Sequence, residues 1–490
     1  MEFEAPQFNL IVISPLLIVV AWSLVLMLVD LALPRERKSW VGWLSLLGYG
    51  AALVQSVALW GTEWGVFVPR DGTPMLLVDN YSTFLNVIFL LTGALSVLFS
   101  LYYLPRAGLN RGEFYYLMMF SISGMMLMGM ANDLILVFLA LELLSIPLYV
   151  LSGFARPRPD SEESAMKYFL LGAFASGFLV FGVALIYGST GSTALPEIVA
   201  NIGQSGVLGA AGAALVLVGL GFKVAVVPFH MWTPDVYEGA PTAVTAFMSV
   251  GAKVGGFAAM IRVFVAALPE LSDIWIPAMA ILAALTMIIG NVVALSQRNI
   301  KRMLGYSSIA HAGYILMAVA ASVDSANGIS SALFYMLAYL FTNLGAFAII
   351  MAVERQEGEG VLLDDYKGLA RRSPWMALAL AYFMLSLTGV PPTGGFSGKF
   401  FVFQATLEAG LVWLAIVGVV TSVISGYFYL RVVYYAFMFD GDGEAVSQPA
   451  LNAVVAITVL ATVLLGILPG YWYSMAQEAI WSGALALVGG

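Results

Sequence analysis

The sequence predicts an all-α, polytopic membrane protein with about 14 transmembrane helices, and three observations lead to this prediction. Hydrophobic residues make up 61% of the 490 residues and charged residues only 10%, whereas a soluble domain carries about 25% charged residues. The mean hydropathy is +0.92, so most of the surface must face lipid. The apolar residues also gather in runs of about 20, the length of a helix that spans a bilayer.

Polar residues, glycines and prolines separate these runs, and each run is interpreted as one helix. In order, the expected helices cover residues 9–33, 39–61, 80–103, 113–131, 133–154, 164–188, 208–229, 240–267, 274–296, 301–322, 327–353, 376–390, 411–438 and 450–475. The first run is long enough to span a membrane, and no pattern of a cleavable signal precedes it. Little more than "MAND" separates the fourth helix from the fifth, so these two are expected to form an antiparallel hairpin.

The basic residues between the runs support this count and orient the helices. Successive connections lie on alternate sides of the membrane. Arg70 is the only basic residue in the connections of one side, and the other basic residues outside the helices fall in, or at the edges of, the connections of the opposite side. These others are Arg35, Arg37, Lys38, Arg106, Arg111, Arg156, Arg158, Arg298, Lys301, Arg302, Arg355, Lys367, Arg371 and Arg372. Because cytoplasmic loops are enriched in lysine and arginine, the alternate set is expected to be cytoplasmic and both termini to lie outside.

Composition also excludes several classes of site. The chain has no cysteine, which excludes disulfides, thiolate nucleophiles, iron–sulfur ligation and thiolate zinc sites. A bis-histidine haem would need both of its histidines, His230 and His311. No Gly-rich phosphate loop follows a strand, and a net charge of −8 without a basic tract argues against nucleic acid as a partner. The chain is therefore expected to bind no cofactor or metal and to carry out no redox chemistry itself.

Six lysine and arginine residues lie inside the apolar runs, and Glu142 joins them; a charge near mid-bilayer costs roughly 3 kcal/mol or more and by default marks a functional path. They are Glu142, Lys167, Lys223, Lys253, Arg262, Lys399 and Arg431. Arg262 and Arg431 lie near helix ends, so we expect them to snorkel to water or to anchor at the interface. Lys167 lies barely one turn into its expected helix, and its depth leaves a structural and a functional role equally open.

Lys253, Glu142 and His311 lie deeper in their helices. Lys253 follows Pro241 by twelve residues, or about 18 Å of helix, which is past the middle of a ~30 Å core. Glu142 lies about 12 Å and His311 about 15 Å from a helix end. The polar residues on the same faces, or on the following helix, are Ser145, Tyr149, Thr242, Thr245, Ser249, Ser307, Ser308, Tyr314, Tyr335, Tyr339, Thr342 and Asn343. Such stripes often only join helices, but beside three ionisable groups we interpret them as a hydrated proton relay.

Two segments break the helical pattern at membrane depth, and each contains a lysine. In "GFKVAVVPFHMWTPDVYEGAP", Pro228 has no N–H and is expected to free the carbonyl of Val224 beside Lys223. The residues of "LTGVPPTGGFSGKFF" that are expected not to continue a helix are Pro391, Pro392, Gly394 and Gly395. Lys399 follows them. Non-helical backbone at this depth is tolerated only where protein or water satisfies it.

Paired interrupted segments point to an inverted-repeat transporter with its site at the breaks. Pro228 and Pro391 are 163 residues apart (391 − 228), which spans five helices, and a displacement by an odd number of helices inverts the repeat. The expected organisation is 1–112 (helices 1–3), 113–270 (first unit, helices 4–8), 271–440 (second unit, helices 9–13) and 441–490 (helix 14). Lys223 precedes its proline whereas Lys399 follows, so the two lysines do not superpose by a simple offset.

These groups suggest how a proton could cross. A desolvated lysine gives up its proton readily, and a neighbouring carboxylate restores the charged form, so Glu142 and Lys223 form a candidate proton switch. The candidates for passing the proton on laterally are Lys253, His311 and Lys399. Each proton moved against the membrane potential needs about 2.3 kcal/mol per 100 mV. Since the sequence shows no ATP site or redox centre, a partner or another ion must supply it.

Three long motifs carry a family resemblance: "GLGFKVAVVPFHMWTPDVYEGAPTAVTAFMSVGAKVGGF", "NVVALSQRNIKRMLGYSSIAHAGYILMA" and "SLTGVPPTGGFSGKFFVF". They resemble the antiporter-like, proton-pumping membrane subunits of respiratory complex I, and most closely the subunit N type of bacterial NADH:quinone oxidoreductase. The resemblance covers helices 4 to 13. It implies a 14-helix fold with two inverted five-helix repeats and discontinuous helices 7 and 12. The family's relay positions fall on Glu142, Lys167, Lys223, Lys253 and Lys399, and with weaker roles on His230 and His311.

The resemblance also implies partners and a driver. Electrons pass from NADH through FMN and iron–sulfur clusters to quinone, all in other subunits. The expected neighbours are the M and K type membrane-arm subunits, with the hydrophilic arm coupled indirectly, in the lipid of a bacterial cytoplasmic (inner) membrane. Mrp-type cation/proton antiporters share the fold, so an antiporter subunit is the alternative function. A purely structural scaffold is disfavoured, because each buried charge costs stability.

Overall fold

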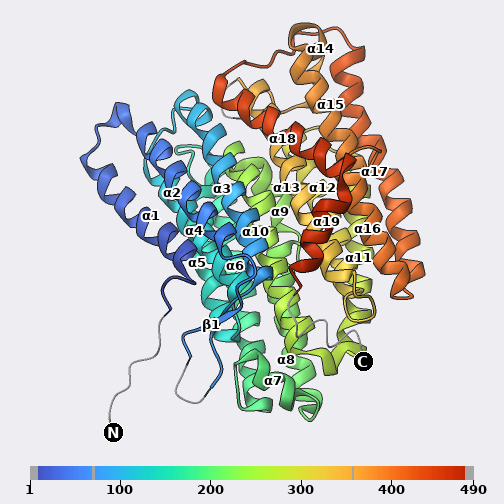
Figure 1. Ribbon diagram of the computed structural model, residues 1–490. Helices are drawn as coiled ribbons and strands as arrows, with labels where there is room; N and C mark the ends of the chain where they lie inside the picture. The colour runs from blue at the N-terminus through green and yellow to red at the C-terminus, as the bar shows by residue number, and fades with distance from the viewer. Residues whose placement is uncertain (1–8, 69–71, 356–357, 481–490) are drawn as a thin grey trace.

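The computed structural model describes residues 9–68, 72–355 and 358–480, and most of this part of the chain is helical (Figure 1). The helices of the first half are α1 (Ser14–Ala32), α2 (Ser39–Ala58), α3 (Asn80–Arg106), α4 (Glu113–Met130), α5 (Leu134–Ser152), α6 (Pro159–Thr190), α7 (Leu195–Ile202), α8 (Gly206–Val224), α9 (Trp232–Gly239) and α10 (Thr242–Ile261). Those of the second half are α11 (Ser272–Ala294), α12 (Ile300–Ala320), α13 (Gly328–Val353), α14 (Leu369–Arg372), α15 (Pro374–Thr388), α16 (Gly394–Glu408), α17 (Val412–Met438), α18 (Pro449–Ile467) and α19 (Pro469–Glu478). A hairpin of two antiparallel strands, β1 (Trp64–Val66) and β2 (Leu76–Val78), joins α2 to α3.

Twelve of the described helices are long and apolar enough to cross a membrane. The count of fourteen stays a prediction, because α4 is not among the twelve and α15 and α16 have only 15 residues each. The hairpin and α7 lie in stretches that were predicted to be irregular connections between helices. Arg70 lies outside the described residues. The expected last helix is divided into α18 and α19, because Pro469 lacks the N–H that would continue α18.

The two ends of the helical bundle carry different elements. The connection from α1 to α2 and helix α14 lie at one end, whereas α7 and β1 lie at the other (Figure 1). The first connection holds Arg35, Arg37 and Lys38, and α14 holds Arg371 and Arg372. We call this end the basic end. Positive charge is thus gathered where the chain was expected to meet the cytoplasm.

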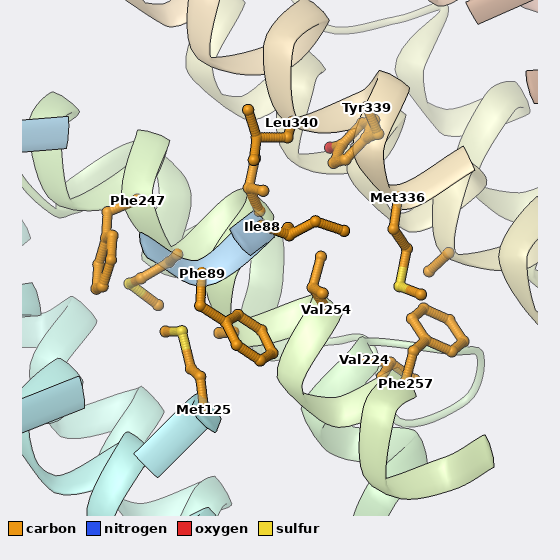
Figure 2. Close-up of a cluster of buried hydrophobic side chains, with 14 of the residues drawn as sticks. Ile88, Phe89, Met125, Val224, Phe247, Val254, Phe257, Met336, Tyr339 and Leu340 are labelled. Carbon is orange, nitrogen blue, oxygen red and sulfur yellow. The ribbon is translucent and has the colours of Figure 1, made fainter. Parts of the chain in front are cut away.

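Helices α10, α12 and α13 form the centre of the bundle. In each of them 94% of the most apolar window is buried, compared with 33% in α1 and α18. Helix α10 packs against α3, α4, α8 and α13, and in Figure 2 Val254 lies between Phe89 and Met336. Polar groups on these three helices are therefore remote from lipid.

Candidate functional site

The first expected break lies between α8 and α9. Helix α8 ends at Val224, and Ala225 takes a left-handed conformation with φ 63°. The chain is thus already out of the helix before Pro228, which does not need to distort it. The N–H of Val227 donates to the hydroxyl of Thr286 on α11 at 2.9 Å. Backbone at membrane depth is satisfied here by a side chain from another helix, as the lipid environment requires.

Lys223 occupies the last turn of α8 and is only 2% exposed. Its Nζ donates to Ser145 Oγ at 2.7 Å and to Tyr168 OH at 2.9 Å. The ring of Tyr168 stacks on Trp232 of α9, with 4.5 Å between the ring centroids. Helix α9, which follows the break, therefore fixes the ring of Tyr168, whose hydroxyl accepts the hydrogen bond from Lys223.

Glu142 does not contact Lys223 directly. Its carboxylate accepts a hydrogen bond from the hydroxyl of Ser176 on α6, and it is half-buried. Ser145, about one turn further along α5, takes the place beside the ammonium. Within the described ranges no ion pair joins Glu142 to Lys223. The structure thus shows this pair in a separated geometry.

Lys253 and His311 are buried at the centre of the bundle, on α10 and α12. Lys253 Nζ donates to the carbonyl of Ser308 at 2.6 Å. His311 Nδ1 lies 2.6 Å from Tyr335 OH, and its Nε2 lies 3.0 Å from Tyr429 OH. The imidazole is therefore held between two tyrosines, one from α13 and one from α17.

Lys399 lies just beyond the second break, and its side chain reaches back across it. Helix α15 ends at Thr388, and Gly389 is left-handed with φ 92°. Lys399 Nζ donates to the carbonyls of Leu387 and Thr388 at 3.1 and 2.9 Å and to Ser422 Oγ at 2.8 Å. A cation is favourable at these free carbonyls, which form the negative end of the helix dipole. This explains why Lys399 follows its break whereas Lys223 precedes the other one.

The extent of the second break differs from the sequence prediction. Pro391 and Pro392 lie between the helices as expected, but Gly394 and Gly395 are the first two residues of α16. Thr393 starts this helix, because its Oγ1 accepts a hydrogen bond from the N–H of Phe396. The glycines therefore serve close packing rather than helix breaking.

Gly395→Ala is expected to destabilise this region, because its new Cβ would lie 1.9 Å from the carbonyl oxygen of Ser386. Overpacking of this kind typically costs about 1–3 kcal/mol. Thermal denaturation of the purified protein should show a lower midpoint for Gly395→Ala. Gly177→Ala on α6 is the matched control, because nothing lies within 4 Å of its Cβ position. Equal midpoints for the two variants would contradict the close approach of α15 and α16.

Lys167 and His230 lie apart from these buried contacts. Lys167 Nζ is 2.7 Å from Glu163 and 2.6 Å from Asp235, and its side chain is 39% exposed. Asp235 also pairs with Arg302 at 2.7 Å, so it joins α6, α9 and α12. His230 is half-buried at the first break. The structure does not bring Lys167 or His230 into hydrogen-bond contact with the buried lysines.

The charged groups around Asp235 line an open pocket of about 290 Å³. Its walls include Glu163, Lys167, Glu238 and Arg302. Although it gathers several carboxylates, no group of three or more His, Asp or Glu side chains in the described residues is placed to hold a metal ion. The pocket is a solvent-accessible, mixed-charge recess.

Arg262 was expected to snorkel to water or to anchor at the interface, and the first of these two roles is wrong. Its side chain is 2% exposed, and its guanidinium donates twice to the carboxylate of Asp79, at 2.7 Å each. Asp79 is the residue that caps the start of α3, and no pattern in the sequence indicates that it pairs with the first residue after α10. Arg431 donates to the carbonyls of Leu295 and Gln297 at the end of α11, and its anchoring at the membrane interface stays a prediction.

Several residues at the site were not singled out from the sequence. Tyr168, Ser422 and Tyr429 contact the buried lysines or His311 from helices that are distant along the chain. No local pattern marks them, because hydroxyl residues are common in membrane helices. Asp235 and Arg302 did carry a signal, since both are charged residues next to apolar runs. Their pairing depends on the packing of α9 against α12.

Comparison with known proteins places this arrangement in a family. Residues 131–425 match the family model described as NADH:quinone oxidoreductase/Mrp antiporter, TM. NADH-quinone oxidoreductase subunit N of Chloroflexus aggregans is 47% identical over 486 residues, which is 97% of this chain and 98% of that protein. A chain of respiratory complex I from Thermus thermophilus with bound aureothin is 37% identical, with a TM-score of 0.80 over 94% of this chain and 98% of that one. A chain of the Mrp complex from Dietzia sp., only 22% identical, shares the fold with a TM-score of 0.86 over 98% of both chains. The chain therefore belongs to the family of NADH-quinone oxidoreductase subunit N.

Proposed function

We propose that this chain is a proton-translocating membrane subunit of NADH:quinone oxidoreductase (complex I). One observation carries the proposal: Lys223, Lys253 and Lys399 are each at most 4% exposed, and in the described part of the chain they donate only to hydroxyls and carbonyls. A buried ammonium without a carboxylate partner is costly. Lysine side chains that are buried without a carboxylate partner exchange protons readily. A purely structural role would not require such lysines.

The relay that we propose starts at Glu142 and Lys223 and continues through Lys253, His311 and Lys399. Approach of Glu142 to Lys223 favours the charged amine, and separation favours release of its proton. The driver is electron transfer from NADH to quinone in partner subunits, which hold the FMN, the iron–sulfur clusters and the quinone. We expect this chain to supply no redox centre. Lys167 and His230 are proposed as secondary members, the first at the solvent-accessible pocket and the second at the break.

We propose the same two-unit organisation that the sequence predicts. The units are 113–270 and 271–440, with 1–112 before them and 441–490 after them. Support comes from the two interruptions, α8 to α9 and α15 to α16, each of which places a buried lysine next to free helix-end carbonyls or a restarted helix. With these interruptions read as one spanning helix each, the count of fourteen follows.

The proposed surroundings are the M and K type membrane-arm neighbours and lipid, in a bacterial cytoplasmic (inner) membrane. The basic end is proposed to face the cytoplasm and both termini to lie outside, because Arg35, Arg37, Lys38, Arg371 and Arg372 gather at the basic end. The hydrophilic arm is coupled indirectly, through other membrane subunits.

A cation/proton antiporter subunit of the Mrp type is the second candidate, supported by the shared fold and by a family model that also describes Mrp antiporters. The identities of 47% and 37% with complex I proteins, against 22% with the Mrp chain, favour the first function. Purification of the tagged chain distinguishes them. Recovery of hydrophilic redox subunits supports complex I, whereas recovery of membrane antiporter subunits alone supports the alternative.

Lys253→Ala tests the relay itself. We expect NADH-driven proton uptake into inverted vesicles to fall by about a hundredfold, since a positioned proton-transfer group typically contributes 10²–10⁴-fold. Quinone reduction is measured in the same vesicles, and the amount of assembled complex is checked on native gels. Lys367→Ala is the control, because Lys367 pairs with Asp364 near the basic end, outside the relay. Wild-type pumping by Lys253→Ala would refute the relay.

A further inference from the structure

A groove runs along the surface of the bundle between α15 and α18. It has a volume of about 1110 Å³, which exceeds the roughly 300–1,000 Å³ of typical small-molecule pockets. Its walls are mostly apolar, with Leu378 and Tyr382 on α15 and Val455, Val459 and Val463 on α18. An open apolar groove of this size is a binding surface. In a membrane, its occupant is either lipid or a partner protein.

The groove begins at the basic end, where both helices start. Ser373 follows Arg371 and Arg372 of α14 and directly precedes α15, which adjoins α14 in Figure 1. The Ser373 hydroxyl donates to the carbonyl of Ala445 at 3.2 Å and accepts from the N–H of Ala445 at 3.0 Å. This contact places the segment before α18 beside the start of α15. We call this end of the groove its mouth.

The length of the groove matches one leaflet of a bilayer. Its lining runs from Pro374 to Tyr382 on α15 and from Asn452 to Val463 on α18, or about 12 Å and 17 Å of helix. One leaflet takes up about 15 Å, half of a ~30 Å hydrocarbon core. A spanning helix of a partner would need a groove along the whole core. The acyl chains of one lipid therefore fit this groove better than a partner helix does.

The mouth of the groove can bind the phosphate of a lipid headgroup. Trp375 stands there and is 82% exposed, as is typical of tryptophan at a membrane–water interface. Arg372 also lines the mouth and supplies a positive charge. No side chain caps the N-terminus of α15 or of α18 in the described part of the chain. Because the N–H groups of a helix's first turn bind phosphate oxygens, these two N-termini add to the attraction of Arg372.

The same mouth carries two acceptors that lack a donor. Glu444 lines it, has a side chain that is 66% exposed, and lies 3.9 Å from Arg372, beyond hydrogen-bond distance. Asn452 donates to Ser447 Oγ at 2.8 Å, but its Oδ1 is buried and accepts no hydrogen bond within the described residues. A buried acceptor without a partner is costly. An ammonium group with N–H donors would satisfy both side chains.

The charges at the mouth distinguish between classes of lipid. Arg372 also pairs with Asp442, so two carboxylates, those of Asp442 and Glu444, stand beside this arginine. An anionic headgroup would bring its negative charge next to them, which is unfavourable. A choline headgroup carries a cation but has no N–H to donate. A zwitterionic headgroup with a primary ammonium matches the cation, the carboxylates and the acceptor at once.

We propose that the groove between α15 and α18 binds one glycerophospholipid with a primary ammonium in its headgroup, such as phosphatidylethanolamine. The phosphate lies at Arg372 and the two helix N-termini, and the ammonium donates to Glu444 and Asn452. The acyl chains lie along α15 and α18 in the leaflet at the basic end. The site is independent of the proposed function, because it concerns lipid binding and not proton transfer.

Photo-crosslinking in the assembled complex tests the site. The complex is placed in vesicles of phosphatidylethanolamine and phosphatidylglycerol with a trace of phosphatidylethanolamine that carries a diazirine in one acyl chain. After irradiation without NADH, mass spectrometry identifies the lipid adducts on peptides of this chain. We expect adducts on α15 and α18 at residues that line the groove. Absence of adducts from both helices, as when a partner subunit fills the groove, would overturn the proposal.

Ala456→Trp fills the groove and leaves the mouth unchanged. Ala456 is exposed and lines the groove on α18, so an indole there takes up room that an acyl chain would occupy. We expect the adducts on α15 and α18 to disappear. Ile457→Trp is the matched control, because Ile457 is exposed on the same helix but is not part of the lining. Undiminished adducts in Ala456→Trp, or an equal loss in both variants, would contradict a lipid in this groove.

Variation of the unlabelled bulk lipid tests the headgroup. Phosphatidylethanolamine should displace the probe about tenfold better than phosphatidylcholine or phosphatidylglycerol, because it alone donates a hydrogen bond to the carboxylate from a cation. Glu444→Gln should lower this preference. Asp440→Asn should keep it, since Asp440 pairs with Arg371 and does not line the groove.

Two results would overturn the assignment of a primary ammonium. They are equal displacement by all three lipids in the wild type and an unchanged preference in Glu444→Gln. Glu444 lies outside the helices and its side chain is exposed, so this variant is expected to assemble. The headgroup test therefore decides the proposal even if Ala456→Trp does not assemble.

Discussion

Replacing Lys223 with alanine is expected to abolish proton pumping while the complex still assembles. The ammonium is buried and donates only to Ser145 and Tyr168 in the described structure. Removing it takes away the group that can pick up and release a proton at the first break, so pumping should fall by about a hundredfold or more. The neighbours left behind are neutral hydroxyls. No buried carboxylate is left without a partner, so the fold should persist.

Lys223→Arg separates charge from proton exchange at the same position. Arginine keeps a positive charge but is not deprotonated in proteins. We therefore expect Lys223→Arg to pump no better than Lys223→Ala, even though it preserves the electrostatics of the site. Proton uptake and quinone reduction, measured together in inverted vesicles, check both variants. Wild-type pumping in Lys223→Ala, or recovery in Lys223→Arg, would contradict a proton-carrying role for Lys223.

The breaks and the buried lysines were predictable because their signals are local. A proline removes an N–H whatever surrounds it, so the interruption near Pro228 could be read directly from the sequence. The burial of Lys253 followed from its distance to the end of a long apolar run. The same reasoning placed Lys399 beside a break, although it could not show that its Nζ reaches back to the carbonyls of Leu387 and Thr388.

The partners of these groups were not predictable, because they depend on which helices pack together. Tyr429 lies 118 residues from His311 along the chain, and no residue pattern around Tyr429 in the sequence marks it as a hydrogen-bond partner of the imidazole. Gly395 was interpreted as a helix breaker, but the tight approach to Ser386 is a property of two helices rather than one. The position of Arg262 near a helix end likewise led to the wrong prediction that its side chain reaches water, because its partner Asp79 lies 183 residues earlier in the chain.

Arg262→Met is expected to destabilise the folded protein by about 3–5 kcal/mol, because it leaves the buried carboxylate of Asp79 without its cation. Methionine keeps much of the volume, so the effect is mainly electrostatic. Thermal or denaturant unfolding of the purified assembly measures the loss. Arg431→Met is the control, since the hydrogen bonds of Arg431 go to neutral groups, the carbonyls of Leu295 and Gln297 at the end of α11. There we expect less than about 1.5 kcal/mol.

A double variant decides whether the loss comes from the stranded charge. Asp79→Asn removes the charge of Asp79 but keeps a side-chain oxygen that can accept from the N–H of Ser82 and cap α3. Combined with Arg262→Met, it should recover about 2 kcal/mol, because replacing both partners of a buried pair is far milder than removing one. If the double variant recovers no stability, or if Arg262→Met is as stable as Arg431→Met, the result contradicts a stabilising role for the buried ion pair between Arg262 and Asp79. Arg262 and Lys223 are both buried cations, but only Arg262 faces a carboxylate, so its loss should lower stability whereas loss of Lys223 should stop proton transfer.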